Sequence, residues 1–297
     1  MTSFGSRLHA ALDAHGPLCV GIDPHLGLLR EWGLDASAAG VREFGLRVVD
    51  AAAGRVGVVK PQVSFFERFG SAGYAALEDV LAAARAAGLL AIADAKRGDI
   101  GTTMDAYAAA WLGAGSPLEA DAMTVSPYLG VGSLTSTFET ALAGDKGVFV
   151  LAATSNPEAR DLQRAIVHRG DDPACEAYAR QSGADLPQTV AHDVVRETSD
   201  WARPRTPEGE WSSIGFVIGA TVDRRERGLP DVTWPVAPIL APGFGAQGAQ
   251  PSDLHRVFGA LAPTVLASES RSILSAGPDA LATTISTRAA EHRSIRG

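Results

Sequence analysis

Four charged residues in the first third of the chain have the types and spacing of an electrostatic catalytic site. Asp94 and Lys96 stand two residues apart, so their side chains point to the same side if that segment is an extended strand. Lys60 and Asp23 end two other short apolar runs, so all four charges can meet at one edge of a sheet. Buried charges are costly unless paired, and such clusters are enriched at functional sites; a structural ion network is the alternative interpretation.

A glycine-rich segment, residues 242–248 (PGFGAQG), has the composition of a backbone cradle for phosphate. It also matches G-x-G-x-x-G, with Glu269 about 20 residues further on, as in a dinucleotide site. Only one more strand-like run follows, however, and a dinucleotide half-fold needs more. We therefore predict a single-phosphate site in which Gly245 and Gln247 belong to the loop and Arg271 makes a bidentate contact. A surface salt bridge is the alternative for Arg271.

Eight short apolar runs recur along the chain and predict eight strands. They span residues 18–22, 56–59, 89–93, 122–125, 148–152, 214–218, 238–241 and 264–267. Continuous apolar runs suit strands buried on both faces, as in a parallel sheet. Between most of them lie Ala- and Leu-rich segments of helical period, for example 38–53, 72–87 and 278–291. This alternation predicts right-handed βαβ units.

The number of repeats favours a closed (β/α)8 TIM barrel, an α/β fold, with residues 1–297 as a single domain. An open doubly wound sheet is the alternative, because periodicity cannot show closure. A TIM barrel builds its active site at the carboxyl ends of the strands, where the candidate residues fall. The longest gap between runs, residues 153–213, is a polar helical stretch followed by a segment rich in Pro, Gly and charge. We expect it to be an enlarged strand–helix connection at the barrel mouth.

The composition argues against several other classes of protein. Hydrophobic residues make up 46% and charged residues 20% of the chain, as in globular proteins, and a net charge of −8 without a basic run argues against nucleic-acid binding. No run of 18 apolar residues and no signal-peptide core is present, so we expect a cytoplasmic protein that does not cross a membrane. Cys19 and Cys175 form no C-x-x-C pair, and His25 has no second ligand at metal-binding spacing. We therefore expect buried free thiols, with one disulfide as the alternative, together with a loop histidine, no metal and no cofactor.

The segment 94–103 (DAKRGDIGTT) resembles the D-x-K-x-x-D-I-x-x-T signature of the orotidine 5′-monophosphate decarboxylases. Sugar-phosphate decarboxylases of the same barrel superfamily share part of this signature. The resemblance extends from about Gly21 to Leu274, and the segments 59–62 and 124–128 resemble the longer-chain bacterial subgroup. Residues 153–213 do not match the short-chain members.

The resemblance implies decarboxylation of orotidine 5′-monophosphate (OMP) to UMP, the last step of de novo pyrimidine biosynthesis, without a cofactor. Lys96 would donate the proton to C6 and stabilise the carbanion there, and Asp94 would lie against the departing carboxylate. Lys60 and Asp99 would complete the charge network, and Asp23 would bind ribose.

The remaining implied roles concern the base, the phosphate and a second subunit. Ser155 would meet the pyrimidine edge, and Gln247, the Gly245 loop and Arg271 would hold the phosphate. In the family, the equivalents of Asp99 and Thr103 enter the site from the partner of a homodimer. Thr103 lies one helical turn after Asp99, so the two can share a face; capping of their own helix is the alternative.

Two further functions remain open for this barrel. Magnesium-dependent sugar-phosphate decarboxylases or aldolases carry an acidic ligand at the end of the second strand, where this chain has Lys60. Because an ammonium repels a divalent cation, we expect activity unaffected by EDTA. A barrel that binds a phosphate ligand without chemistry would bind UMP but leave OMP intact.

Overall fold

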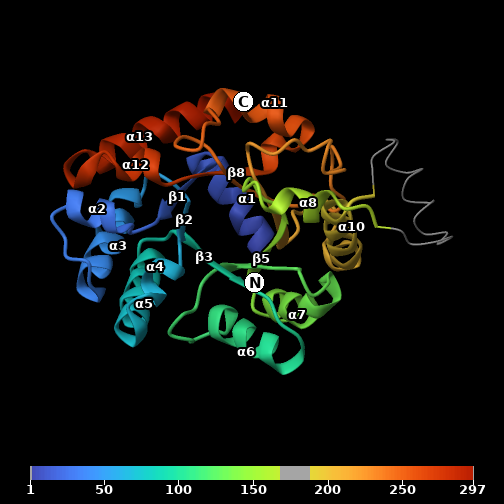
Figure 1. Ribbon diagram of the computed structural model, residues 1–297, viewed down its shortest axis with the longest axis horizontal. Helices are drawn as coiled ribbons and strands as arrows, with labels where there is room; N and C mark the ends of the chain where they lie inside the picture. The colour runs from blue at the N-terminus through green and yellow to red at the C-terminus, as the bar shows by residue number, and fades with distance from the viewer. Residues whose placement is uncertain (1, 168–187, 297) are drawn as a thin grey trace.

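Eight parallel strands form a closed barrel in the computed structural model, which describes residues 2–167 and 188–296. The strands are hydrogen-bonded in chain order, and β8 pairs with β1 (Figure 1). They are β1 (Leu18–Ile22), β2 (Val58–Pro61), β3 (Leu90–Arg97), β4 (Ala122–Val125), β5 (Gly147–Ala153), β6 (Ile214–Ile218), β7 (Ile239–Pro242) and β8 (Val265–Glu269). The predicted (β/α)8 barrel is therefore confirmed, and the open sheet is excluded.

The strands lie within one or two residues of the predicted runs, except at the end of β3. The predicted run stops at residue 93, whereas β3 continues to Arg97. Its pairing with β4 is irregular there, because Ala93 pairs with Met123 and the next pair is Arg97 with Val125. This irregularity lies at the carboxyl end of the strand, among the charged residues of the D-x-K segment.

Helices surround the barrel and bury their apolar faces against the outer face of the sheet (Figure 1). In α3, for example, the Ser37 side chain caps the first turn by accepting a hydrogen bond from the Gly40 amide. The fully buried residues Val41, Phe44 and Val48 follow at helical spacing and form its apolar face. The principal helices are α3 (Ala38–Ala52), α5 (Gly70–Ala86), α6 (Gly101–Leu112), α7 (Thr135–Ala143), α10 (Val190–Ala202) and α13 (Gly277–Arg296). Shorter helical elements are α2 (Leu26–Glu31), α4 (Ser64–Glu67), η1 (Val131–Leu134), η3 (Pro251–Asp253), α11 (Leu254–Phe258), η4 (Gly259–Thr264) and α12 (Arg271–Leu274).

The helix α1 (Phe4–His15) closes the amino-terminal end of the barrel, and sequence analysis did not predict it. Its buried Phe4, Leu8 and Leu12 form one cluster with inward-facing strand residues such as Phe149. The contact is close, since a Cβ on Gly147 would lie 2.2 Å from the Phe4 ring. Figure 1 shows α1 crossing behind the strands. The opposite, carboxyl-terminal mouth is left for the site.

The long connection between β5 and β6 contains α8 (Ala159–Arg164), α10 and η2 (Arg203–Arg205) in its described parts. The buried residues of α10 include Ala191 and Val195, and this helix packs against β5 and β6 as a barrel helix does. Cys175 lies in this connection but outside the described residues, whereas Cys19 is a buried free thiol. None of the described helices combines the length and the apolar character that a membrane crossing needs.

Candidate active site

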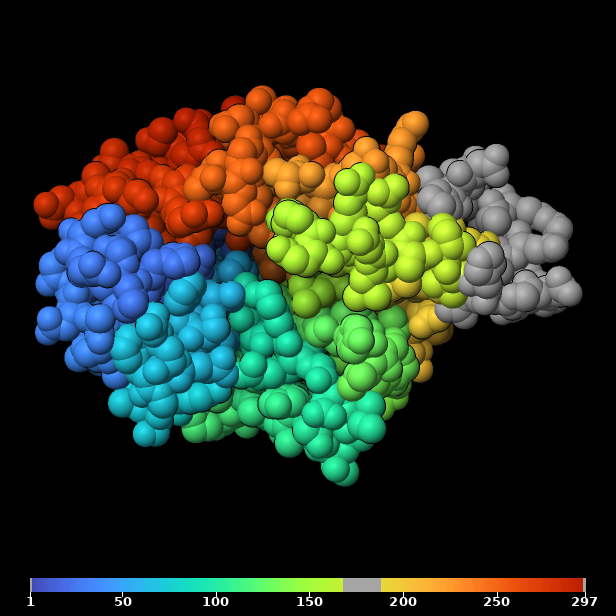
Figure 2. Space-filling model, in the orientation of Figure 1, coloured from blue at the N-terminus to red at the C-terminus, as the bar shows by residue number. Residues whose placement is uncertain are grey.

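A cavity of about 530 Å³ opens at the carboxyl-terminal mouth of the barrel. Figure 2 shows this mouth as a hollow near the centre of the face, bordered by segments from both ends of the chain. Residues from the ends of β1, β2, β3, β5, β7 and β8 line it. Leu151, Val217 and Leu240 give it apolar surface, and its charged groups are Asp23, Lys60, Asp94, Lys96 and Arg271.

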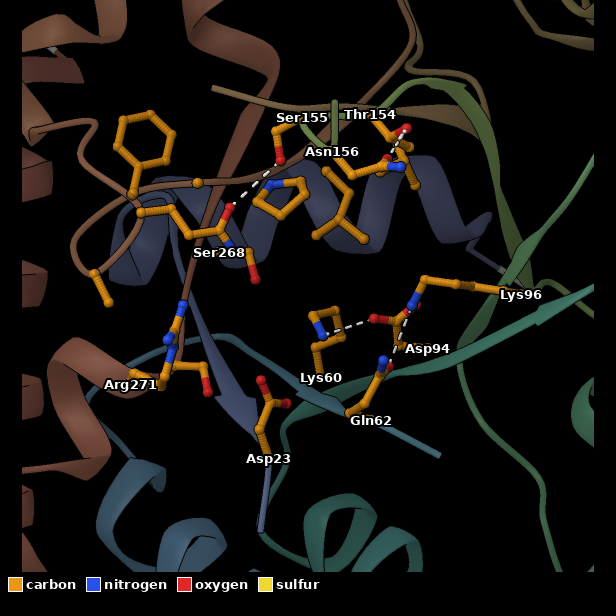
Figure 3. Close-up of a pocket in the computed structure, with 18 of the residues that line it drawn as sticks. Asp23, Lys60, Gln62, Asp94, Lys96, Thr154, Ser155, Asn156, Ser268 and Arg271 are labelled. Atoms are coloured by element: carbon orange, nitrogen blue, oxygen red, sulfur yellow. Dashed lines mark hydrogen bonds and ion pairs between the residues drawn. The ribbon is translucent and has the colours of Figure 1, made fainter. Parts of the chain in front are cut away.

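Lys60, Asp94 and Lys96 form a tight charged cluster on one side of the cavity (Figure 3). Lys60 Nζ lies 2.9 Å from Asp94 Oδ2, and Lys96 Nζ lies 2.6 Å from Asp94 Oδ1. The two ammonium groups thus bind the two oxygens of one carboxylate. Only Lys96 is well exposed to the cavity: its side chain is 44% exposed, against 9% for Lys60 and 12% for Asp94.

The cluster shifts the pKa values of its buried members in opposite directions. Burial alone would raise the pKa of Asp94, but the charges and hydrogen bonds of Lys60 and Lys96 outweigh it and hold that pKa well below its usual range. Burial would likewise lower the pKa of Lys60, but Asp94 and then Asp23 raise it above its usual value. The carboxylate and the buried ammonium therefore remain ionised across the physiological range.

Gln62 and Thr124 complete the contacts of the Asp94 carboxylate, and sequence analysis placed neither in the site. With its amide nitrogen toward Asp94, Gln62 donates to Oδ2 over 2.7 Å and accepts from Lys96 Nζ over 3.2 Å. Thr124 Oγ1 donates to Asp94 Oδ1 over 2.9 Å. Gln62 follows Lys60 by two residues, so the same spacing rule that paired Asp94 with Lys96 could have found it.

Asp23 lies beside this cluster at the end of β1, whose Gly21 pairs with Lys60 of β2. Its Oδ1 is buried and has no hydrogen-bond partner within the part of the chain that the structure describes. An ionised carboxylate accepts hydrogen bonds only, and a buried acceptor without a partner is costly. The arrangement suits a ligand that brings a hydroxyl group to this point.

The glycine-rich loop lies between β7 and η3, on the same mouth. Gly243, Gly245 and Gly248 all have positive φ, at 120°, 69° and 110°, a backbone region that side chains disfavour. Gly245 also has no room for a side chain, since a Cβ there would lie 2.4 Å from Ser272 Oγ. Gln247 of this loop lines the cavity, but Gly245 does not.

Arg271 lines the cavity at the start of α12, on the side opposite Lys96 (Figure 3). Its guanidinium has neither an ion pair nor a hydrogen bond among residues 2–167 and 188–296. The alternative of a surface salt bridge therefore has no support in the described chain. An exposed, unpaired guanidinium beside a glycine loop is suited to bidentate recognition of a phosphate.

A buried ion network holds the strand end that carries this arginine. Glu269, the last residue of β8, is 1% exposed. Its Oε2 accepts a hydrogen bond from Ser272 Oγ over 2.7 Å. Its Oε1 lies 2.6 Å from His292 Nε2 and 2.5 Å from Arg288 Nη2. Burial would raise the pKa of Glu269, but the hydrogen bonds from His292, Arg288 and Ser272 lower it to about 2. The ring of His292 in turn contacts Phe244 of the glycine loop edge-on. Helix α13 thus fixes the geometry of the anion-binding side.

Ser155 and His25 also line the cavity. The Ser155 hydroxyl lies 3.4 Å from Gln247 Oε1, which joins the β5 connection to the glycine loop. His25, expected to be a loop histidine, precedes α2 and contacts the Phe65 ring edge-on. In the described residues, no group of three or more His, Cys, Asp or Glu side chains is placed to hold a metal ion.

Asp99 and Thr103 do not line the cavity of their own chain. Asp99 Oδ1 accepts from the Ile100 amide, and α6 begins after Ile100 without a side-chain cap, so the helix-capping alternative finds no support. Thr103 is exposed on α6. Ile100, which follows Asp99, is 63% exposed, and Tyr128 and Leu129 in the connection after β4 are 77% and 52% exposed.

The cavity therefore combines an anion-binding side with a charged reaction side. One end offers the Arg271 guanidinium and a glycine loop, and the other offers the exposed Lys96 ammonium fixed against a carboxylate. Such a site can hold a phosphate ester and, at a fixed distance from the phosphate, stabilise negative charge and deliver a proton.

Comparison with known proteins gives consistent results. The family model described as orotidine 5′-phosphate decarboxylase / HUMPS matches residues 16–283. An orotidine 5′-phosphate decarboxylase of Salinispora tropica is 50% identical over 282 residues, which is 95% of this chain and 93% of the relative. One of Streptomyces coelicolor is 48% identical with the same coverage of both chains.

Solved structures resemble this barrel over its whole length. A Streptomyces avermitilis protein described as a candidate orotidine 5′-phosphate decarboxylase is 44% identical, with a TM-score of 0.86 covering 100% of this chain and 96% of that one. The OMP decarboxylase of Leishmania donovani is 29% identical, with a TM-score of 0.74 and 99% coverage of both chains.

Proposed function

Because the chain belongs to the orotidine 5′-phosphate decarboxylase / HUMPS family and is an enzyme that decarboxylates OMP to UMP, we propose that the Lys60–Asp94–Lys96 cluster carries out this reaction. The observation that supports the proposal most is the exposed Lys96 ammonium, held 2.6 Å from a carboxylate that is itself neutralised by Lys60. It lies across the cavity from Arg271 (Figure 3).

In the proposed reaction, the bond between C6 and the carboxyl carbon breaks and its electron pair stays on C6. Because the adjacent ring offers no sink for these electrons, a nearby fixed cation lowers the barrier most effectively. The Lys96 ammonium stabilises the developing carbanion and then transfers a proton from Nζ to C6, which gives UMP. The neutral amine regains its proton from solvent after product release.

Asp94 has two parts in this proposal. It holds the Lys96 ammonium in place, and its negative charge lies where the substrate carboxylate must bind. Repulsion between the two carboxylates favours the departure of CO2, which carries no charge. Lys60 and Gln62, on the other oxygen of Asp94, keep this carboxylate ionised and fixed during the reaction.

The remaining cavity residues bind the non-reacting parts of the nucleotide. We assign the ribose hydroxyl to the unpartnered Asp23 Oδ1, the pyrimidine edge to Ser155, and the phosphate to Arg271, Gln247 and the amides of the Gly245 loop. Binding energy from these groups can be used to organise the charged cluster, because it is realised most fully when the reacting carbon is in place.

One assay separates this mechanism from its two rivals. Purified protein is mixed with OMP, and the fall in absorbance and the formation of UMP are followed with and without EDTA. Rapid turnover that EDTA leaves unchanged supports the proposal. Loss of turnover with EDTA and its return with magnesium would favour a metal-dependent reaction. A thermal shift with UMP but no consumption of OMP would indicate a binding protein.

We further propose a homodimer in which Asp99 and Thr103 of one subunit enter the site of the other. Both residues lie outside the cavity of their own chain, although Asp99 follows Lys96 by only three residues. Ile100, which directly follows Asp99, is a large exposed apolar side chain, as are Tyr128 and Leu129 in the connection after β4, and a two-fold contact would bury such side chains.

Complementation tests the shared site. Inactive Lys96→Ala is mixed with inactive Asp99→Ala under conditions that exchange subunits. Each hybrid dimer then has one intact site, so activity should return to about a quarter of wild type in a statistical mixture. The matched control mixes Lys96→Ala with Asp94→Ala, which belong to one chain's site, and should stay inactive. Absence of recovery in the first mixture, with exchange verified, would place Asp99 in its own subunit's site.

A further inference from the structure

Thr124 occupies an unusual position opposite the irregular end of β3. The β3–β4 ladder pairs Ala93 with Met123 and then Arg97 with Val125. Three residues of β3, 94–96, therefore face a single residue of β4, which is Thr124. Regular backbone pairing cannot continue across such a mismatch, so the D-x-K segment needs another source of hydrogen bonds there.

The Thr124 hydroxyl supplies hydrogen bonds to both Lys96 and Asp94. Its Oγ1 accepts from the Lys96 backbone amide over 2.9 Å and donates to Asp94 Oδ1 over 2.9 Å. The residue is 1% exposed and does not line the cavity, so we expect it to act on the reaction through Lys96 and Asp94. One hydroxyl thus joins the backbone of the proton donor to the carboxylate beside it.

The backbone of Lys96 shows why this contact matters. Its φ is +50°, in the left-handed region that a residue with a side chain adopts at a cost. Such a conformation persists only where the surroundings fix it, and the amide of Lys96 is fixed by Thr124. Relaxation of φ toward the extended range would redirect the side chain and move Nζ away from its position against Asp94.

We propose that Thr124 is a positioning residue for this decarboxylase: its hydroxyl holds Lys96 in the left-handed conformation and keeps Asp94 aligned with it. This inference rests on the proposed roles of Lys96 and Asp94. It concerns a buried barrel residue that acts through both of them. The side chain must combine a hydroxyl with a shape that fits the barrel interior, which threonine and, less completely, serine provide.

The test compares Thr124→Val, which keeps the branched shape without the hydroxyl, with Thr124→Ser, which keeps the hydroxyl. We expect kcat of the valine variant to fall roughly 10- to 100-fold, because a charge-assisted hydrogen bond is lost and the proton donor is misplaced. KM for OMP and the affinity for UMP should change less than about threefold, since the groups that bind the nucleotide are untouched. The serine variant should recover kcat to within about fivefold of wild type, because it restores the hydroxyl.

Thr264→Val is the matched control. Thr264 is also buried, and its hydroxyl donates to the Leu261 carbonyl over 2.9 Å, away from the site. This variant should lose stability like Thr124→Val but keep wild-type kcat. If Thr124→Val does not fold, Thr124→Ala replaces it in the comparison with serine.

Three results would overturn the proposal: wild-type kcat in Thr124→Val, equal loss in the serine and valine variants, or equal loss of kcat in Thr264→Val. Failure of the wild-type protein to convert OMP would instead overturn the proposed function, so the two failures are distinguishable.

Discussion

Replacing Asp94 with asparagine removes the charge at the centre of the site while keeping its shape. Lys60 then remains as a buried ammonium, since its side chain is 9% exposed and Asp94 is its direct ion-pair and hydrogen-bond partner within the described chain. Lys96 loses the same partner but is 44% exposed, so water can solvate it. The variant should therefore lose stability as well as activity, and mainly through Lys60.

The magnitude follows from the burial of the pair. Removing one partner of a buried ion pair costs about 3–5 kcal/mol, because an uncompensated charge is left behind. The asparagine oxygen can still accept one hydrogen bond from Lys60, so we expect the lower end, a loss of about 3 kcal/mol in the free energy of unfolding. For a domain of this size that corresponds to a fall in Tm of about 5–10 °C.

Denaturant unfolding of four proteins measures this effect: wild type, Asp94→Asn, Lys60→Met with Asp94→Asn, and Asp79→Asn as a control. Asp79 forms an exposed pair with Arg42, so its variant should change stability by less than about 1 kcal/mol. The double variant should be more stable than Asp94→Asn alone, because it removes the orphaned ammonium. Wild-type stability in Asp94→Asn, or a double variant less stable than the single one, would refute this reasoning.

Three further predictions concern the anion-binding side and the pH dependence of stability. Arg271→Ala should lower kcat/KM for OMP roughly 10- to 150-fold in steady-state kinetics, which corresponds to a loss of about 1.5–3 kcal/mol. An unchanged kcat/KM would exclude the phosphate contact. Because the pKa of Glu269 is lowered from 4.5 to about 2, its stabilising effect should be complete above pH 5 and lost as pH falls to 2. The loss should be on the order of 3 kcal/mol in acid unfolding, and Glu269→Gln should lack this part of the pH dependence. The pKa of Lys60 is raised above its ordinary value of 10.5, so the charged form of Lys60 should stabilise the fold fully below pH 10.5. This stabilisation should be lost only at higher pH, as Lys60 titrates in the folded protein. ¹⁵N NMR of the lysine Nζ atoms should show Lys60 still protonated when the other lysines have lost their protons.

Much of the site could be predicted because parallel strands end at one edge of a barrel. The apolar runs located the strands, and the charged residues at or shortly after their ends, Asp23, Lys60 and Arg271, therefore had to meet at the same mouth. Spacing of two residues placed Asp94 and Lys96 together, and their contact is present in the structure. Closure itself could not be predicted from periodicity, since it depends on the pairing of β8 with β1.

The parts that sequence analysis missed depend on irregular backbone or on packing between distant segments. Thr124 lies within a buried apolar run and is indistinguishable there from a core residue; its role depends on the mismatch between β3 and β4. The helix α1 carries Phe4, Leu8 and Leu12 four residues apart, which is a helical signal, but its burial inside the barrel required the assembled strands.

The small number of lysines in the composition is a further signal that indicates the site. The chain has only three lysines, Lys60, Lys96 and Lys146, although lysine and arginine together number 26. Two of the three lie in the charged cluster. A proton donor must be able to lose its proton, which an arginine does not do in a protein, so a preference for lysine at these positions indicates chemistry rather than charge alone.

The most direct test of the mechanism is the turnover of Lys96→Ala, with Lys146→Ala as the control. Lys146 pairs with Glu119 outside the cavity, so its loss should leave turnover unchanged. The Lys96 variant should keep its circular dichroism spectrum and bind UMP, yet lose at least about 10³-fold in kcat for OMP, since both charge stabilisation and proton delivery are removed. Near-normal turnover by folded Lys96→Ala would contradict the account.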